Sequence, residues 1–281
     1  MVRVEAAGFL TTIQDLGRKG YGNVGVPVSG VMDLYSAKIA NLMLQNSENN
    51  AVLEITFGNC TLFFEKETVI CISGADFSAT INNQLVVLNS ILKINKNDVL
   101  KFRKRNYGVR TYIAIFGGFK TKKFLKSRSF YINITKDSVL KKGDLLPYKS
   151  YNKKITSTLS TIKPNILQFN KKTIECFKGP EYILLSELQK KNIINTLFSI
   201  SNANNRMAYL LNELIENTLE SMLTSAVLPG TVQLTPSGKL IILLRDCQVT
   251  GGYPRILQLT PEAINIISQK TTHDSFKFKL I

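Results

Sequence analysis

Short apolar runs rich in Val, Ile, Phe and Thr dominate the first half of the chain. Gly, Asn and Asp turns separate these runs at short intervals, which is the pattern typical of β-strands. The predicted strands cover residues 52–56, 61–64, 69–73, 84–88, 99–102 and 111–116. Two further runs, 240–244 and 256–259, flank a polar segment near the C-terminus. Many short strands with frequent turns predict a mainly β protein, folded as a barrel or sandwich.

Two segments show helical spacing of apolar residues instead. In residues 32–44, Met32, Ala37, Ala40 and Leu44 fall near one face, with Ser29 as a candidate cap. Residues 185–198 carry a second such pattern. The sequence therefore predicts a few short helices beside the strands.

The pattern changes between residues 141 and 163, where Pro147 precedes a polar run rich in Lys, Ser and Thr. We interpret this stretch as a linker. It predicts two domains of ordinary size, residues 1–155 and 156–281, and no repeat of 20 to 50 residues is visible.

Composition fits a globular protein of 281 residues, 44% of them hydrophobic. No run approaches the about 18 to 20 apolar residues that span a bilayer, and the first residues lack the apolar core of a secretion signal. We therefore predict a cytoplasmic protein without a membrane partner. The four cysteines are scattered, so we expect reduced, mostly buried thiols, with neither disulfides nor a zinc site.

The chain is strongly basic, with 36 Lys plus Arg against 20 Asp plus Glu and a formal charge of +16. Such a charge favours anionic partners, such as nucleotides or acidic protein subunits. The basic residues form short clusters at 101–105, 120–126, 171–172 and 190–191 and are not interleaved with aromatic residues. This distribution argues against nucleic acid and also fits a solvated lysine-rich surface.

Polar residues are densest in residues 245–255, between two runs that read as buried strands. Gly251 and Gly252 can adopt positive φ and admit a ligand close to the backbone, and Arg255 can bind an anion bidentately. Gly-Gly before Pro is also common in plain turns. The segment therefore predicts either a site or a structural turn.

A second polar segment covers residues 11–33. It holds five glycines between Gly17 and Gly30, and it offers Gln14, Asp15, Arg18 and Asp33 as donors and acceptors. It can equally be a long loop that seals one end of a barrel.

Several kinds of site are excluded or weakened. Gly238-Lys239 lacks the first glycine and the final Ser or Thr of a phosphate-binding loop. The single histidine, His273, lies in a polar turn, where we expect a surface residue and no metal site or catalytic triad. Acid–base chemistry would fall to carboxylates such as Asp15, Asp33, Asp76 and Asp246, none of which can be singled out as the base.

Eight motifs, taken in order, resemble one known family. They are T-T-I-Q-D-L-G-R-x-G-Y, G-V-P-x-S-G-x-M-D, A-N-x-x-x-x-N, L-E-I-T, S-G-A-D, S-R-S, R-M-x-Y and Q-x-T-G-G-Y-P-R-I. Together they resemble the biotin-dependent carboxyltransferase domain family. Its members include the C subunit of the ATP-dependent 5-oxoprolinase, the antagonist of the sporulation-kinase inhibitor, and part of urea carboxylase.

The resemblance implies a mainly β fold of two cyclophilin-like β-barrel subdomains with a few short helices. It also implies a role as the C subunit of a 5-oxoprolinase complex with subunits A and B, inactive alone, in which ATP drives opening of 5-oxoproline to glutamate. ATP can be bound by the complex and not by this chain.

The resemblance also implies site residues. Catalytic roles fall to Asp15, Gln248 and Arg255. Substrate-binding roles fall to Gln14, Arg18, Asp33, Asp76, Arg206, Thr250, Gly251, Gly252 and Tyr253. Arg206 and Arg255 would act as anion clamps, while Gln248 and the glycine backbone would donate to an oxyanion.

Two segments depart from the family pattern. Residues 205–210 read N-R-M-A-Y-L where the family has D-R-M-G-Y-R, and a shortened segment replaces the glycine-rich loop between Ser129 and Gly143. His273 stands where the family usually has Gly in its closing turn.

Two other functions remain open. One is transfer of a carboxyl group from carboxybiotin to urea or another small amide, for which biotin would be the cofactor. The other is a regulatory or diverged binding partner of the oxoprolinase B subunit.

Overall fold

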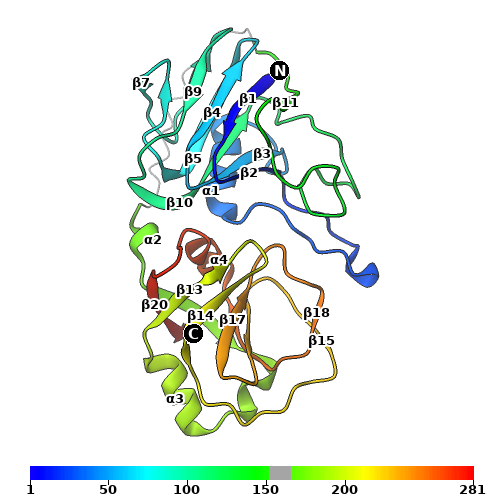
Figure 1. Ribbon diagram of the computed structural model, residues 1–281, viewed down its shortest axis with the longest axis vertical. Coiled ribbons are helices and arrows are strands. Elements are labelled where there is room, and N and C mark those ends of the chain that lie inside the picture. Colours follow the sequence, from blue (N-terminus) through cyan, green and yellow to red (C-terminus); the bar gives the residue numbers. More distant parts are fainter. Residues whose placement is uncertain (152–165) are drawn as a thin grey trace. The chain divides into compact units, whose positions relative to one another are not determined.

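The computed structural model describes residues 1–151 and 166–281 and divides the chain into two compact units (Figure 1). The first unit comprises Met1–Arg18 and Ser29–Asn165, and the second comprises Lys19–Val28 and Ile166–Ile281. The predicted boundary between residues 155 and 156 lies outside the described residues. No sequence pattern indicated that Lys19–Val28 joins the second unit.

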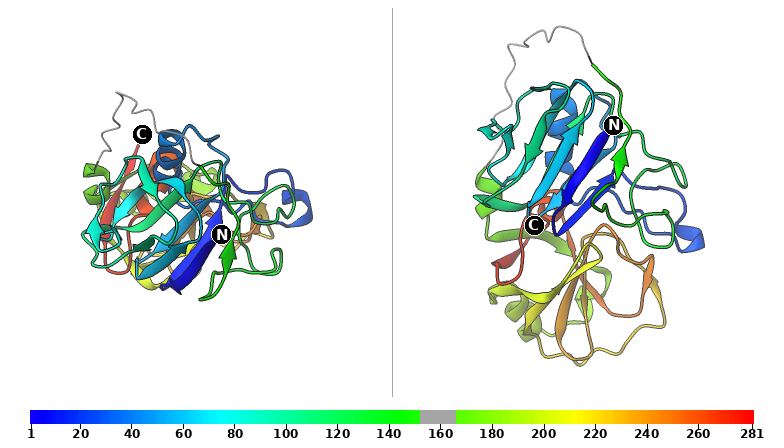
Figure 2. Two further views of the ribbon diagram at one scale, coloured as in Figure 1. Left: turned by 90° about the horizontal axis from the view of Figure 1, so that it is seen from above. Right: turned by 45° about the horizontal axis from the view of Figure 1, so that its top comes forward.

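Two sheets form the first unit. One has the strand order β11-β1-β4-β9-β6-β7 and the other β2-β3-β10-β5-β8. Figure 2 shows β1, in blue, beside β11, in green. The strands of the first sheet are β1 (Val2–Ala7), β4 (Cys60–Phe64), β6 (Thr80–Ile81), β7 (Gln84–Leu85), β9 (Val99–Lys101) and β11 (Leu145–Leu146). Those of the second are β2 (Leu10–Gln14), β3 (Val52–Thr56), β5 (Thr68–Asp76), β8 (Leu92–Ile94) and β10 (Tyr107–Ile115).

A shared apolar core joins these two sheets. Val4 and Leu62 from the first sheet belong to the same buried cluster as Leu53, Ile72 and Ile113 from the second. Alternation along each strand places these residues on one face, so burying that face drives the two sheets together.

One helix, α1 (Leu34–Met43), packs on β5 and β10 through Ala37 and Ala40, beside Cys71 and Tyr112. The expectation that Ser29 caps this helix was wrong. Asp33 is the N-cap, and its side chain accepts a hydrogen bond from the Ser36 backbone N–H at 3.1 Å. The helix therefore begins two residues later than its apolar pattern predicted.

A closed barrel forms the second unit, with the strand order β12-β19-β16-β17-β14-β13-β20. Its strands are β12 (Thr173–Lys178), β13 (Phe198–Asn204), β14 (Ala208–Leu214), β16 (Thr231–Leu234), β17 (Lys239–Leu243), β19 (Arg255–Leu259) and β20 (Ser275–Leu280). Alternate residues such as Leu240 and Ile242, or Phe276 and Phe278, are buried, as a filled barrel interior requires.

The second unit also contains short helices and a two-stranded sheet. They are η1 (Gly22–Val24), α2 (Leu167–Asn170), η2 (Pro180–Leu184), α3 (Glu187–Asn195), α4 (Pro261–Ile267) and the two-stranded sheet of β15 (Ser225–Ala226) and β18 (Thr250–Gly251). Ser186 and Gln189 cap α3 reciprocally in a capping box. The prediction of a mainly β chain with a few short helices is therefore confirmed. Within the described ranges, no helix is long and apolar enough to cross a membrane.

Candidate functional site

The polar groups of the first motif lie at the end of β2, where Asp15 is only 4% exposed. Its carboxylate accepts hydrogen bonds from the Gly17 and Arg128 backbone N–H groups at 2.9 and 2.7 Å. It also accepts from the Ser127 and Ser129 hydroxyls at 2.6 and 2.8 Å. The S-R-S motif at residues 127–129 is thus the partner of the T-T-I-Q-D motif. These four bonds give Asp15 a structural role, while its predicted catalytic role stays a prediction.

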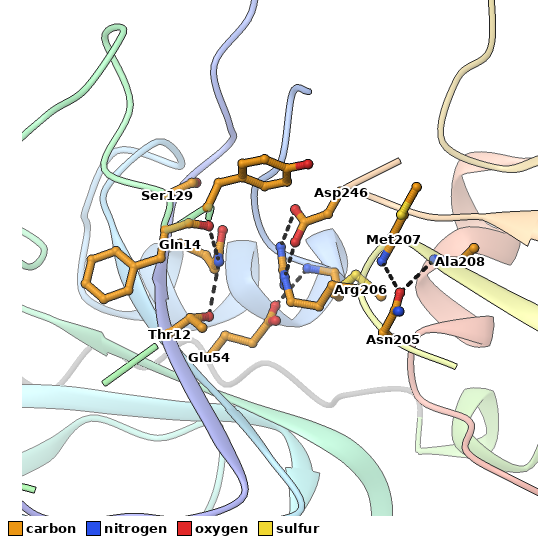
Figure 3. A network of polar contacts seen from close by, with 12 residues as sticks. Thr12, Gln14, Glu54, Ser129, Asn205, Arg206, Met207, Ala208 and Asp246 are labelled. Carbon is orange, nitrogen blue, oxygen red and sulfur yellow. Dashed lines mark hydrogen bonds and ion pairs between the residues drawn. The ribbon is translucent and has the colours of Figure 1, made fainter. Parts of the chain in front are cut away.

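Gln14 is fully buried beside Asp15, and Figure 3 shows its amide nitrogen donating to Thr12. The same nitrogen also donates to the Phe130 backbone carbonyl. The donor–acceptor distances are 3.1 and 3.4 Å. Its carbonyl oxygen has no hydrogen-bond partner among the described residues. A buried acceptor without a donor is costly, so this oxygen is a candidate ligand contact.

Arg18 and Asp33 are also buried in the first unit. The Arg18 guanidinium donates to the Ser129 backbone carbonyl. Asp33, besides capping α1, accepts from the Ser36 hydroxyl at 2.6 Å, and its backbone N–H donates to the Tyr112 hydroxyl at 2.8 Å. Burial raises the pKa of Tyr112 well above its usual value, with a further contribution from the Glu54 and Asp33 carboxylates.

Glu54 is a buried carboxylate that we did not predict as a site residue. It lies in the middle of β3 and is 1% exposed (Figure 3). Its carboxylate accepts from the Met32 backbone N–H at 2.8 Å. The signal was present in the sequence, because Glu54 is the charged residue of the L-E-I-T motif inside an otherwise apolar strand.

Asp76 takes part in a turn at the end of β5. Its carboxylate accepts from the Ser78 backbone N–H and from the Asn106 side-chain amide, each at 2.8 Å. Such an Asx-type turn is a sufficient structural reason for an aspartate here. Nothing in the geometry joins Asp76 to the Asp15 cluster of the same unit.

In the second unit, Arg206 forms an ion pair with Asp246 (Figure 3). Arg206 Nε lies 2.8 Å from Asp246 Oδ2, and Nη2 lies 3.1 Å from Oδ1. This parallel arrangement is the strong, bidentate form of an arginine–carboxylate contact. The guanidinium predicted to clamp an anion thus already binds a carboxylate of its own unit.

Residues 205–208 form a hydrogen-bonded turn, although this motif departs from the family pattern. Asn205 Oδ1 accepts from the Met207 and Ala208 backbone N–H groups at 2.7 and 3.1 Å (Figure 3). An aspartate oxygen would make the same bonds, so Asn replaces Asp without loss of this turn. Ala208 does not have positive φ, so the position does not require the family's glycine.

Arg255 at the start of β19 is likewise engaged. Its Nε and Nη2 atoms donate to the two carboxylate oxygens of Glu181 at 3.0 and 2.8 Å, and Nη1 donates to the Ala226 backbone carbonyl at 2.9 Å. Hydrogen bonding from Arg255 lowers the pKa of Glu181, and the carboxylate raises the pKa of Arg255. No motif pointed to Glu181, which lies 74 residues away.

Close contacts with neighbouring atoms, and not positive φ, explain why residues 251 and 252 are glycines. Neither has positive φ, so that part of the prediction was wrong. A Cβ atom on Gly251 would lie 2.7 Å from Gln233 Nε2, and one on Gly252 would lie 3.1 Å from the Met222 carbonyl oxygen. Gln233, which is buried, donates to the Tyr253 backbone carbonyl at 3.2 Å and so fixes the loop that carries both glycines.

Gln248, just before this loop, is partly buried, and its carbonyl oxygen has no hydrogen-bond partner among the described residues. Thr250 and Tyr253 are exposed on the same loop. The Gln248 carbonyl is therefore a candidate ligand contact in this segment.

The cysteines offer no reactive thiol here. All four are free and buried, as predicted, and burial raises the pKa of Cys60, Cys71, Cys176 and Cys247 to about 12. Cys247, next to the polar segment, is thus protonated at neutral pH and is a poor nucleophile. No group of three or more metal-ligating side chains occurs in the part of the chain that is described.

Two curated bacterial proteins are similar to this chain over most of its length. The C subunit of the Escherichia coli 5-oxoprolinase is 31% identical over 262 residues, which cover 91% of this chain and 83% of that protein. The C subunit of the Haemophilus influenzae 5-oxoprolinase is 28% identical over 279 residues, covering 96% of this chain and 88% of the other.

The fold is also similar to a solved structure. The Kluyveromyces lactis urea amidolyase matches with a TM-score of 0.85 and 26% identity over 99% of this chain. This chain spans only 18% of the amidolyase chain. Residues 24–280 match the model of the carboxyltransferase domain, subdomains A and B. Because this match covers most of the sequence, the chain belongs to the carboxyltransferase domain family, subdomains A and B.

Proposed function

We propose that this chain is the C subunit of a 5-oxoprolinase that opens 5-oxoproline to glutamate. The observation that carries the proposal is the similarity to the C subunit of the Escherichia coli 5-oxoprolinase over 91% of this chain. A match over 91% of the chain leaves too few residues uncovered to omit either unit.

The chemistry of the candidate site supports a cyclic amide as substrate. Opening the lactam adds one water across its C–N bond, with the nitrogen leaving as an amine and the carbonyl becoming a carboxylate. A lactam N–H is a donor, and the Gln248 carbonyl is an acceptor without a partner among the described residues. Gln248 would bind the lactam N–H and orient the ring.

The reaction would need ATP and two further proteins, subunits A and B, in the cytoplasm. The formal charge of +16 suits an acidic partner protein. Asp15, Arg206 and Arg255 are engaged within their own units, so in this proposal they shape the site and do not act as free catalytic groups.

The test is reconstitution of the chain with its cognate subunits A and B, followed by a glutamate-release assay on 5-oxoproline. We expect glutamate only when ATP and this chain are both present. If a stable complex forms and releases no glutamate with or without ATP, the proposal is wrong. A regulatory partner of the B subunit would then be the better account.

A second function has one observation in its favour. The matched family is a carboxyltransferase family, and the Lachancea kluyveri urea amidolyase is 36% identical over 148 residues, covering 51% of this chain. Carboxyl transfer to urea would require separate biotin-bearing partners. Transfer of labelled bicarbonate to urea that depends on biotin and on this chain would favour that function.

A further inference from the structure

A pocket of about 400 Å³ opens in the first unit, on the segment that differs from the family pattern. Its volume lies in the range of small-molecule sites. Aromatic and aliphatic side chains supply much of its wall, namely Phe124, Phe130, Leu140, Leu145, Leu146 and Pro147.

The walls are fixed by hydrogen bonds of the fold. The Lys120 backbone N–H donates to the Pro147 carbonyl at 2.8 Å, which ties the two sides together. The Thr135 hydroxyl bonds to the Tyr131 and Asp137 carbonyls at 2.9 and 2.7 Å. The pocket is therefore built into the loop and needs no ligand to form.

One residue of the pocket lining carries a polar atom that the described part of the fold leaves unsatisfied. Thr121 lines the pocket, and the Thr121 hydroxyl is buried without a hydrogen bond to any described residue. Leaving a buried hydroxyl unpaired costs free energy that a bound ligand would recover.

Cationic side chains outnumber anionic ones around Thr121, although the lining itself holds two lysines and two aspartates. Lys122 and Lys136 line the pocket, and the Lys122 ammonium lies 5.1 Å from the centre of the Phe124 ring. Burial, together with Arg128, Lys149 and Lys123, lowers the pKa of nearby Lys120. Of the two aspartates in the lining, Asp144 already accepts from the Lys141 backbone N–H at 2.8 Å. The local field therefore favours an anion.

We propose that this pocket binds a small organic carboxylate with an apolar body. The carboxylate accepts the Thr121 hydroxyl and lies near Lys122, while the apolar body packs on Phe124, Phe130 and Leu146. Phe130 also connects the pocket to the candidate site, because its carbonyl accepts from Gln14. The proposal concerns a second ligand of the chain and does not depend on the 5-oxoprolinase function.

The test is a titration of the full chain with phenylacetate, followed by calorimetry and by NMR of the Phe124 and Phe130 signals. We expect saturable binding that Thr121→Val weakens by about two- to tenfold, the loss of one hydrogen bond. The neutral analogue phenylacetamide should bind more weakly than phenylacetate.

Thr80→Val is the matched control, because Thr80 is another buried hydroxyl without a partner among the described residues and does not line the pocket. It should leave phenylacetate binding unchanged. Leu145→Trp gives a second variant, since Leu145 is 52% exposed and an indole there should block the pocket without disturbing the core. No saturable binding below about 10 mM, or binding that neither Thr121→Val nor Leu145→Trp weakens, would overturn the proposal.

Discussion

Asp15 and Gln14 are neighbours in sequence but differ in how their own unit uses them. The Asp15 carboxylate accepts four hydrogen bonds from Gly17, Ser127, Arg128 and Ser129. The Gln14 carbonyl accepts none from the described residues. In the second unit, Arg255 likewise binds Glu181, whereas the Gln248 carbonyl accepts no hydrogen bond from the described residues. Motifs indicate which residues matter, but only the structure separates groups used by the fold from groups left for a ligand.

Asp15→Ala should lower the free energy of unfolding of the first unit by about 2 to 4 kcal/mol, because it removes a buried acceptor from four donors. Urea unfolding followed by circular dichroism measures this loss. Asp137→Ala is the control, since Asp137 is exposed and should change stability by less than about 0.5 kcal/mol. Equal, small effects of both substitutions would contradict the structural role of Asp15.

Arg255→Ala should destabilise the second unit by about 1 to 3 kcal/mol, because it leaves the Glu181 carboxylate without its main partner. An exposed, unpaired arginine would contribute little to stability, but Arg255 is only 21% exposed and is paired with Glu181. The comparison is made by urea unfolding at pH 7, with Arg103→Ala, whose side chain is exposed, as the control.

The stability difference between wild type and Arg255→Ala should depend on pH. Arg255 lowers the folded-state pKa of Glu181 below its ordinary value of 4.5. The stabilisation is therefore present above about pH 4.5 and is lost as the pH falls through the folded-state pKa. A difference between the two proteins that stays constant from pH 7 to pH 3 would contradict the pair.

Among the helices and strands, the strands were the easiest to predict. β3 (Val52–Thr56) matches its predicted range, because β-branched residues and flanking turns mark it clearly. The helix α4 was missed although Thr260, Pro261 and Glu262 supply a cap, a first helical proline and an acidic first turn. We made no prediction for its seven residues, because so short a helix shows little periodicity.

The turn at His273 shows how a family comparison can anticipate backbone geometry. His273 is exposed, as predicted, and has φ 69°, in the left-handed region that favours glycine. This conformation is a physical reason for a glycine at position 273.

Asp33→Ala should cost about 1 to 2 kcal/mol, because α1 loses its N-cap, whereas Asp33→Asn should retain most of the stability. Asn can accept the Ser36 N–H as Asp does. Thermal unfolding of both variants checks this. If Asn proves as damaging as Ala, the charge of Asp33 matters beyond the cap.

At the scale of the whole molecule, the closure of the barrel could not be predicted from local sequence patterns. The barrel closes through parallel pairing of β12 with β20, which joins Thr173 to Lys277 across about a hundred residues. The transfer of Lys19–Val28 to the second unit is equally non-local. These features depend on packing that no local pattern specifies, whereas the ordered family motifs identified the fold correctly.

The proposed function links single residues to the complete assembly. In this proposal, the Gln248 carbonyl, which accepts from no described residue, belongs to a site that is completed within a larger complex. The most direct test is the kcat/KM for 5-oxoproline of the reconstituted complex that carries Gln248→Met. Methionine has a similar shape and removes the acceptor. Gln84→Met, at an exposed position of β7, is the matched control.

We predict that Gln248→Met lowers kcat/KM by at least about tenfold, since one lost transition-state hydrogen bond of about 1.4 kcal/mol has that effect. Its free energy of unfolding should stay within about 0.5 kcal/mol of wild type, because no described residue donates to the carbonyl. An unchanged kcat/KM in a folded, assembled complex would contradict the account and remove Gln248 from the site.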